Sequence, residues 1–569
     1  MNHFRTGGSL SLILALSCCF LIILSQKQVS AFPLNMPSLV DKRATAEFTC
    51  TTCEGPFYSQ GLETYRVPMA MYELNRARLV QAMLQKLGGK ATGIILLQGG
   101  QQQTRYDTDN EPVFRQESYF HWAFGVPEAG VYGAISMPTG RATLFVPKYG
   151  LDYEVFCGES PSIDSIRAKY GVEDVLFIDD LPAYIESHLE QADDAQLHLM
   201  TGLNSDSGNM AMPAHYDGIS QHAPKMTTDT LFDCIAESRV IKTDAEVDAM
   251  RYTHWVSSMA HVEVMRNCKA GMMEYQLESL FQHHTYTHGG CRHQSYTCIC
   301  ACGPNPAVLH YGHAGAPNNR LLEDGDLALL DMGAEYHCYA SDITCSYPVN
   351  GRFTDDQRMV YEAVLEAQVA VLAAMRPGTT WPEMHRAAER AILQGLVKTG
   401  LLTGNVDDML AAHLGAIFMP HGLGHLIGLD THDVGGYATG TPARSDQPGL
   451  SKLRTARVLE VGMVLTVEPG CYFINVLLDI ALKNPAQSIF FNTDRLKDFR
   501  NFGGVRLEDG VLVTPDGCEN LTMCPRTVSE VLSVMSGGSW PPEKDAMPEL
   551  RRNWVKREAG KMVRFTLPS

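Results

Sequence analysis

The clearest hydrophobic pattern in the chain follows Thr243, where apolar positions recur with the period of a helix. Thr243 and Glu246 have the spacing of a capping box, in which each side chain binds the backbone of the other residue. The apolar positions after it are Val247, Met250, Trp255, Met259 and Val262. Residues three or four apart share one helix face, so we expect a long amphipathic helix and a domain boundary near residue 240.

A second helix of the same kind is predicted after Thr354. Thr354 and Gln357 form another capping box, and Pro377-Gly378 ends the pattern because proline cannot continue a helix. The apolar stripe between these two signals consists of Val360, Val364, Val371 and Met375.

Upstream of residue 240, short apolar runs alternate with helical stretches. GIILLQG (93–99) and GRATLFVPK (140–148) have the composition of strands, whereas LNRARLVQAMLQKL (74–87) has helical periodicity. This alternation predicts an α/β domain. Strand-like segments around the later helices favour a curved antiparallel sheet backed by helices, so the overall class is α/β (α+β).

The chain is therefore divided into five predicted parts. These are a targeting segment (1–31), a linker or transit segment (32–59), an N-terminal α/β domain (60–242), a second, sheet-and-helix domain (243–535) and a tail (536–569). The tail contains a basic run with Arg551, Arg552, Lys556, Arg557, Lys561 and Arg564, and we expect it to be solvated.

Composition narrows the range of partners. The 569 residues carry a formal net charge of −18, which argues against nucleic acid because binding a phosphate backbone requires a basic surface. A hydrophobic content of 45% describes a globular protein with ample core.

The N-terminal segment has the features of a signal peptide. Arg5 precedes an apolar run, Leu10–Leu24, that is shorter than the roughly 20 residues needed to span a bilayer. Cleavage after Ala31 would leave no membrane span, while an uncleaved anchor is the alternative. The following Phe32 and the acid-poor stretch 32–46 also fit a bipartite plastid presequence. We therefore expect entry into the secretory pathway, or a plastid, with the cytoplasm as the alternative.

The 16 cysteines do not identify a redox compartment. Cys298, Cys300 and Cys302 alternate as neighbours on one face of a strand would, which is a structural arrangement. Cys50 and Cys53 have CxxC spacing without a second pair to complete a zinc site, so incidental thiols are the first reading and a redox role the second.

The candidate chemistry lies in five residues of the last half of the chain, each in a segment that suits a strand or a tight turn. They are Asp331, Asp342, His425, Glu468 and Glu508. Four carboxylates brought together repel one another unless a cation lies between them. Oxygen ligands with a single imidazole favour Mn²⁺-like ions over softer metals. The carboxylates suffice to bridge two metal ions about 3.5–4 Å apart.

The segments around these residues resemble the metallopeptidases of the pita-bread fold, and among them the eukaryotic prolidases. The resemblance covers roughly residues 60–530 and rests on motifs that occur in the same order. These include QESYFHWAFGV, RHQSYTCIC, HYGHAGAPN, DMGAEYHCYASDITCSYPVNG, MPHGLGH, THDVGGY, LRTAR, LTVEPGCYF and FGGVR. A zincin is excluded because His421 and His425 are separated by Gly-Leu-Gly and lack the Glu of HExxH.

The resemblance implies a role for each of the five residues. Asp331 would bind one metal ion and His425 the other, Asp342 and Glu508 would bridge both, and Glu468 would be a ligand that also transfers the proton of the nucleophile. Asp331 and Asp342 are eleven residues apart, so pairing of their strands as a hairpin would direct both side chains into one cavity.

Substrate roles are implied for four further residues. His310 and His432 would stabilise the oxyanion of the tetrahedral intermediate, and Arg454 would bind the free carboxylate of a C-terminal proline. Tyr296 would contact the substrate and also support the metal site, and Arg506 would support that site. His313, His421 and Asp433 are assigned no chemistry.

The resemblance thus implies a dinuclear metal-dependent Xaa-Pro dipeptidase, with two divalent ions per subunit, Mn²⁺ favoured, acting through a metal-bridged hydroxide. It also implies a homodimer. The nearest alternative is an X-prolyl aminopeptidase that takes longer peptides. A pita-bread binding module without ligands is a third reading, which the five filled ligand positions disfavour.

Overall fold

The structure is a computed structural model that describes residues 55–90, 92–313 and 317–568. The predicted targeting segment 1–31, most of the predicted linker, and the Cys50–Cys53 pair therefore lie outside the described residues. Within the described ranges, no helix combines the length and apolar character needed to cross a membrane.

A six-stranded mixed sheet forms the centre of the N-terminal domain. Its strands, in spatial order, are β10 (Met226–Thr227), β7 (Leu197–His198), β3 (Ile94–Gln98), β4 (Tyr132–Ser136), β5 (Ala142–Val146) and β6 (Asp174–Phe177). The β3–β4–β5 pairs are antiparallel, and the outer pairs are parallel. This confirms the α/β character predicted for this part of the chain.

Alternation along β3 gives this sheet two buried faces. Ile95 and Leu97 belong to the large core that includes Leu79 of helix α1 (Ala70–Lys86), whereas Ile94 and Leu96 pack in a second core with α5 (Leu181–Leu189). Successive side chains of a strand point to opposite faces, so an uninterrupted apolar run requires cover on both. The other helices of this half are α2 (Ser118–Phe124), α3 (Leu151–Cys157), α4 (Ile163–Tyr170) and α6 (Leu231–Val240), and its remaining strands are β1 (Phe57–Tyr58), β2 (Val67–Pro68), β8 (Gly202–Leu203) and β9 (Met210–Ala211).

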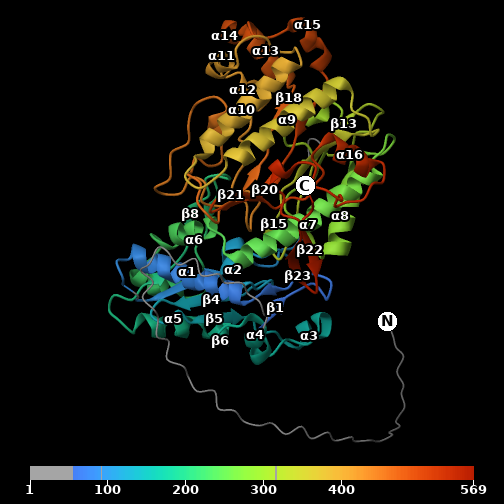
Figure 1. The fold of residues 1–569 in the computed structure, drawn as a ribbon. Coiled ribbons are helices and arrows are strands. Elements are labelled where there is room, and N and C mark those ends of the chain that lie inside the picture. The colour runs from blue at the N-terminus through green and yellow to red at the C-terminus, as the bar shows by residue number, and fades with distance from the viewer. Residues whose placement is uncertain (1–54, 91, 314–316, 569) are drawn as a thin grey trace, which may run out of the picture. The chain divides into compact units, whose positions relative to one another are not determined.

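The two predicted amphipathic helices are confirmed with their capping boxes. Helix α7 (Asp244–Asn267) starts at the Thr243 cap, and α9 (Asp355–Ala374) starts at the Thr354 cap. Helix α9 runs alongside α10 (Trp381–Lys398), as Figure 1 shows, and α7 packs on α8 (Glu274–Gly289). Shorter helices follow: α11 (Val406–Ala411), α12 (Gly415–Phe418), α13 (Asn475–Lys483), α14 (Pro485–Ser488), α15 (Thr493–Leu496) and α16 (Val528–Met535).

The strands of the second domain pair antiparallel throughout the described residues. The sheets are β12 (Ile299–Cys302), β13 (Leu327–Asp331) and β16 (Thr344–Pro348); β11 (His293–Gln294), β14 (Ala334–Tyr336) and β15 (Tyr339–Ala340); β17 (Val464–Val467), β20 (Asp509–Thr514) and β21 (Gly517–Asn520); and β18 (Gly470–Tyr472) with β19 (Gly504–Arg506). Strands β13 and β16 pair with Asp331 opposite Thr344, two residues beyond Asp342. The pairing of the two aspartate segments, on which a shared cavity depended, is therefore present.

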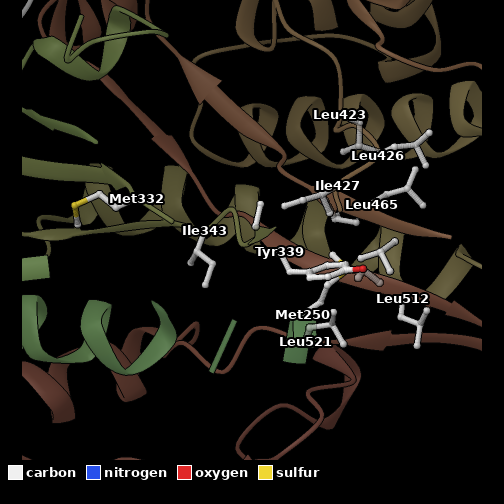
Figure 2. Packing of buried hydrophobic residues seen from close by; sticks show 14 of the residues in the cluster. Met250, Met332, Tyr339, Ile343, Leu423, Leu426, Ile427, Leu465, Leu512 and Leu521 are labelled. Carbon is white, nitrogen blue, oxygen red and sulfur yellow. The ribbon is translucent and has the colours of Figure 1, made fainter. Parts of the chain in front are cut away.

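A dense apolar cluster lies directly behind the candidate ligands. Met332 follows Asp331 in the chain and Ile343 follows Asp342, and both of these apolar residues are buried. Figure 2 shows part of this cluster, with Met250, Met332, Tyr339, Ile343, Leu423, Leu426, Ile427, Leu465, Leu512 and Leu521 labelled. The segments that carry the acids are therefore fixed by the core on their other side.

The predicted cysteine alternation is also confirmed. Cys298, Cys300 and Cys302 lie in the large core, while the intervening Ile299 and Ala301 lie in a separate small cluster. The twelve cysteines within the described ranges are free thiols, eleven of them buried or partly buried. This supports a packing role for the three alternating cysteines.

The C-terminal stretch is only partly solvated: Lys556, Lys561 and Arg564 are exposed, as predicted, but Arg552 is buried. Strands β22 (Val555–Glu558) and β23 (Lys561–Arg564) form a hairpin, and Trp554 packs in a cluster with Trp255 and Met259 of α7. The basic run misled the prediction because its second arginine is buried: Arg552 pairs with Glu530 at 2.8 Å and with Asp545. The segment thus covers apolar side chains of α7 that would otherwise be exposed.

Candidate active site

The five predicted ligands converge on one cavity of about 780 Å³. Its walls include Asp331, Asp342, His425, Glu468 and Glu508, together with His310, His432, Arg454, Tyr296 and Arg506. Every residue to which the sequence assigned a site role therefore lines the same space, although these residues span more than 200 positions of the chain.

Strand ends and tight loops position the ligands. Asp331 ends β13, and Glu508 lies between β19 and β20. Gly424, beside His425, has no room for a side chain, because a Cβ atom there would lie 2.0 Å from the carbonyl oxygen of Thr466. This close approach allows the backbone N–H of His425 to donate to the Thr466 hydroxyl at 3.1 Å.

The ligand atoms are close enough to share a cation. Asp342, His425 and Glu508 each offer an atom within 4.8 Å of the others, and all three residues are buried. The His425 Nε2 atom lies 3.3 Å from Asp342 Oδ2 and 3.6 Å from Glu468 Oε1. The other ring nitrogen, Nδ1, donates to the carbonyl of Leu426 at 3.1 Å, which leaves the Nε2 lone pair for a metal ion.

The protein by itself does not neutralise this group of acids. Burial, reinforced by repulsion from neighbouring carboxylates, raises the pKa of Glu468 to about 7 and that of Glu508 well above its usual range. Burial also raises the pKa of Asp331, despite the opposing effect of Arg506. Asp342 Oδ1 is buried without a hydrogen-bond partner. Hard oxygen donors with an orphaned oxygen and one imidazole fit divalent cations.

A second set of polar side chains holds the acids in place. Tyr296 donates to Asp331 Oδ1 at 2.6 Å, and Thr344 donates to Glu508 at 2.7 Å. Arg506 is buried and donates to the Thr344 hydroxyl at 3.0 Å, to the Tyr472 hydroxyl at 2.8 Å and to Asp331. Tyr296 and Arg506 thus both donate hydrogen bonds to the candidate ligand Asp331.

Three of the predicted substrate residues face the open part of the cavity. His310 and His432 are exposed, and desolvation by the cavity walls with nearby cations lowers the pKa of both, which favours neutral imidazoles. The His432 ring lies 4.6 Å from the His425 ring, measured between centroids. Arg454 is 28% exposed and forms an ion pair with Asp206 at 3.6 Å between Nη1 and Oδ1.

The residues left without assigned chemistry separate into two kinds. Asp433 is buried and pairs with Arg239 at 2.6 Å and Lys242 at 3.0 Å, so it is structural. His421 borders the cavity, where Nε2 lies 3.0 Å from the Tyr472 hydroxyl, while burial lowers the pKa of the His421 ring to about 3. His313 is exposed at the cavity wall.

The sequence prediction missed four residues of this site. Tyr472 and Thr344 lie inside motifs already quoted, CYF and SDIT, but only their hydrogen bonds reveal their contribution. Asp206 and Arg444 also line the cavity. Asp206 lies in an Asn-Ser-Asp-Ser-Gly turn of the N-terminal domain, and no sequence signal connects that turn to the second domain.

Comparison with known proteins agrees with this geometry. The sequence profile of metallopeptidase family M24 matches residues 248–515, and that of the aminopeptidase P N-terminal domain matches residues 72–198. The structure of Pseudomonas aeruginosa aminopeptidase PepP is similar at a TM-score of 0.66 and 32% identity, over 83% of this chain and 99% of that one. Zinc-substituted Escherichia coli aminopeptidase P in complex with product is similar at a TM-score of 0.65 and 30% identity, over 82% and 98% of the two chains.

The chain therefore belongs to metallopeptidase family M24, with an aminopeptidase P-type N-terminal domain before a pita-bread catalytic domain. The predicted family and fold class are confirmed. Within the family, the chain is similar to the Xaa-Pro dipeptidase of Rattus norvegicus, at 53% identity over 482 residues, which cover 85% of this chain and 96% of the relative.

Proposed function

We propose that this protein is an Xaa-Pro dipeptidase that depends on divalent metal ions. The observation that carries the proposal is the presence of two charged groups in one cavity: the acids around His425, and the Arg454 guanidinium. The first group suits cation binding, and the second suits recognition of a carboxylate. Similarity to the rat Xaa-Pro dipeptidase supports the same substrate class.

The side chains of the protein have separate tasks in this proposal. Asp331, Asp342, His425, Glu468 and Glu508 would hold two divalent cations, which supply Lewis acidity and lower the pKa of a water molecule. Glu468 accepts a proton from that water and delivers it to the proline nitrogen that leaves.

Neutral His310 and His432 donate hydrogen bonds to the carbonyl oxygen as it gains negative charge. Arg454 binds the free carboxylate, so a good substrate must have its C-terminus at this position. Tyr296 fixes Asp331 through its 2.6 Å hydrogen bond and borders the substrate space.

Mn²⁺ is the cation we propose, because the donor set has four carboxylates and one imidazole and no sulfur. We also propose a homodimer, on the resemblance to prolidases, which molar-mass measurement in solution would test. Entry of the chain into the secretory pathway, or onward passage to a plastid, remains our proposal from the sequence of residues 1–46.

The test uses purified protein treated with a chelator and then given Mn²⁺, Zn²⁺ or Mg²⁺. Gly-Pro should be hydrolysed after Mn²⁺ is restored, while the tripeptide Gly-Pro-Ala should be a poor substrate because its carboxylate is displaced from Arg454. Faster cleavage of the tripeptide would favour the X-prolyl aminopeptidase alternative. Absence of both bound metal and hydrolysis would favour a binding module.

A further inference from the structure

A turn of the N-terminal domain reaches into the cavity of the catalytic domain. Residues 204–209 connect β8 to β9, and the Asn204 side chain accepts hydrogen bonds from the backbone N–H groups of Asp206 at 2.9 Å and Ser207 at 3.1 Å. Gly208 has a φ of +72°, a left-handed conformation that closes the turn. The tip that carries Asp206 is therefore a defined structure.

Asp206 contacts the arginine that is proposed to bind the substrate. The Asp206 side chain is 7% exposed, and Oδ1 lies 3.6 Å from Arg454 Nη1. Arg444 supports the same turn from the catalytic domain, because Nη2 donates to the Ser205 carbonyl at 3.5 Å. Among the residues that the structure describes, Asp206 is the one carboxylate paired with Arg454.

The contact leaves most of the guanidinium available. Within ranges 55–90, 92–313 and 317–568, the shortest contact between the Arg454 side chain and an acid is the 3.6 Å ion pair with Asp206 Oδ1, which is buried. A guanidinium has five N–H donors and can bind two carboxylates on different edges. One ion pair at Nη1 would orient the side chain while the remaining donors face a ligand.

We propose that Asp206 is a positioning residue that holds Arg454 ready for the substrate carboxylate. The inference rests on the proposed function of Arg454 and extends it to the N-terminal domain. An arginine side chain loses considerable rotamer freedom when it is fixed, so a carboxylate that fixes it beforehand improves binding. Recognition of the C-terminal end of the substrate then depends on both domains.

Binding of two matched ligands tests this inference without requiring turnover. N-acetyl-L-proline carries the carboxylate, N-acetyl-L-prolinamide lacks it, and neither has a free amino group. Both are titrated calorimetrically into the metal-loaded wild type, Asp206→Ala, Asp206→Asn, Arg454→Ala and the double variant Asp206→Ala/Arg454→Ala. Asp217→Ala is the matched control, because Asp217 is an exposed acid of the same domain outside the cavity.

Both Asp206 variants should bind N-acetyl-L-proline about tenfold more weakly, which corresponds to about 1.4 kcal/mol, and bind the amide unchanged. In the Arg454→Ala background, removal of Asp206 should have no further effect. Metal content and thermal unfolding that match the wild type would exclude misfolding of the Asp206 variants. Asp206→Asn also preserves the shape of the side chain, so it is the variant less prone to misfold.

Several outcomes would overturn the inference. Tighter binding of the carboxylate ligand by the Asp206 variants would mean that Asp206 competes for Arg454. A positioning role would be excluded if the Asp206 variants lost affinity equally for both ligands, or lost none. It would also be excluded if removal of Asp206 still weakened binding in the Arg454→Ala background, or if the wild type did not prefer the carboxylate ligand. Hydrolysis of Gly-Pro is scored separately, so a wild type that binds N-acetyl-L-proline but leaves Gly-Pro intact would refute the dipeptidase proposal alone.

Discussion

Arg506 donates a hydrogen bond to Asp331 from within the group of buried acids. The same guanidinium lies 3.9 Å from Glu508, so one fixed positive charge serves two of the proposed metal ligands. Arginine remains charged at all physiological pH values and therefore offsets part of the repulsion before any cation binds. Burial and the neighbouring carboxylates still raise the pKa of Glu468 and Glu508, so repulsion remains that bound divalent cations would offset.

Replacement of Asp342 by Asn should remove bound metal. The substitution keeps the size of the side chain but deletes a charge that is 3.3 Å from His425 Nε2. We expect loss of one or both cations, measured by mass spectrometry of the metal content, and a fall in Gly-Pro hydrolysis by several orders of magnitude. The control variant Asp324→Asn, which changes an exposed acid of the same domain, should retain both the bound metal and the hydrolysis of Gly-Pro. Full metal content and turnover in Asp342→Asn would contradict the ligand assignment.

Replacement of Arg454 by Ala should selectively impair substrates with a free carboxylate. Hydrogen bonds to charged groups contribute about 1.5–3 kcal/mol, so kcat/KM for Gly-Pro should fall about 10- to 150-fold. Gly-Pro amide should be poor for the wild type and lose little more in the variant. Steady-state kinetics with both substrates measures the difference, and equal losses would show that Arg454 does not bind that carboxylate.

The metal-free protein should become less stable as the pH rises. The folded-state pKa of Glu468, about 7, lies above its ordinary value of about 4.3, and the pKa of Glu508 is raised too. A group with a raised folded pKa binds more protons in the folded state, so its contribution to stability is present at low pH and lost as pH rises toward 7.

Urea unfolding of chelator-treated protein at pH 5, 6, 7 and 8 would measure this decline. Saturating Mn²⁺ should reverse the trend, because cations bind the deprotonated ligands. A metal-free protein whose stability rises over this range would mean that another titration dominates.

Arg552→Ala should destabilise the catalytic domain although it lies far along the chain from the site. The Arg552 side chain is fully buried, and its removal leaves Glu530 and Asp545 without their cation. Breaking a buried pair costs about 3–5 kcal/mol, measurable by urea unfolding. Lys556→Ala, which breaks an exposed pair with Glu558, should cost less than about 1 kcal/mol. Similar small losses in both variants would show that the buried ion pairs of Arg552 contribute little to stability.

A protein that begins at Phe32 should fold and hydrolyse Gly-Pro as well as the full chain does. The resemblance to prolidases starts near residue 60, and the apolar run Leu10–Leu24 suits a segment that is removed. Residues 1–31 fused to a fluorescent protein should direct it out of the cytosol. Cytosolic retention of the fusion would refute the targeting proposal and leave the enzymatic proposal intact.

The sequence allowed prediction of those features that local chemistry determines. Capping boxes predicted the starts of α7 and α9, and motif order predicted four acids and one imidazole that line one cavity. Contacts between distant segments could not be predicted in this way. In the sequence, Arg552 is indistinguishable from a surface cation, and only the structure shows that it is buried against Glu530. Asp206 likewise has the sequence context of an ordinary turn residue, and only the structure shows that its turn lies beside Arg454. Burial and domain packing, which single-sequence patterns do not encode, decided both cases.

Because the proposed metal ligands lie directly against the apolar cluster, the stability of the core and the affinity for metal ions are linked. Met332, Ile343 and Leu426 each follow a ligand in the chain and lie in that cluster, so a loosened core shifts the atoms that hold the cations. Ligands that bind only the folded state stabilise it by mass action. Core variants distant from the cavity should therefore behave as metal-affinity variants, inactive at scarce Mn²⁺ and restored when the Mn²⁺ supply is increased.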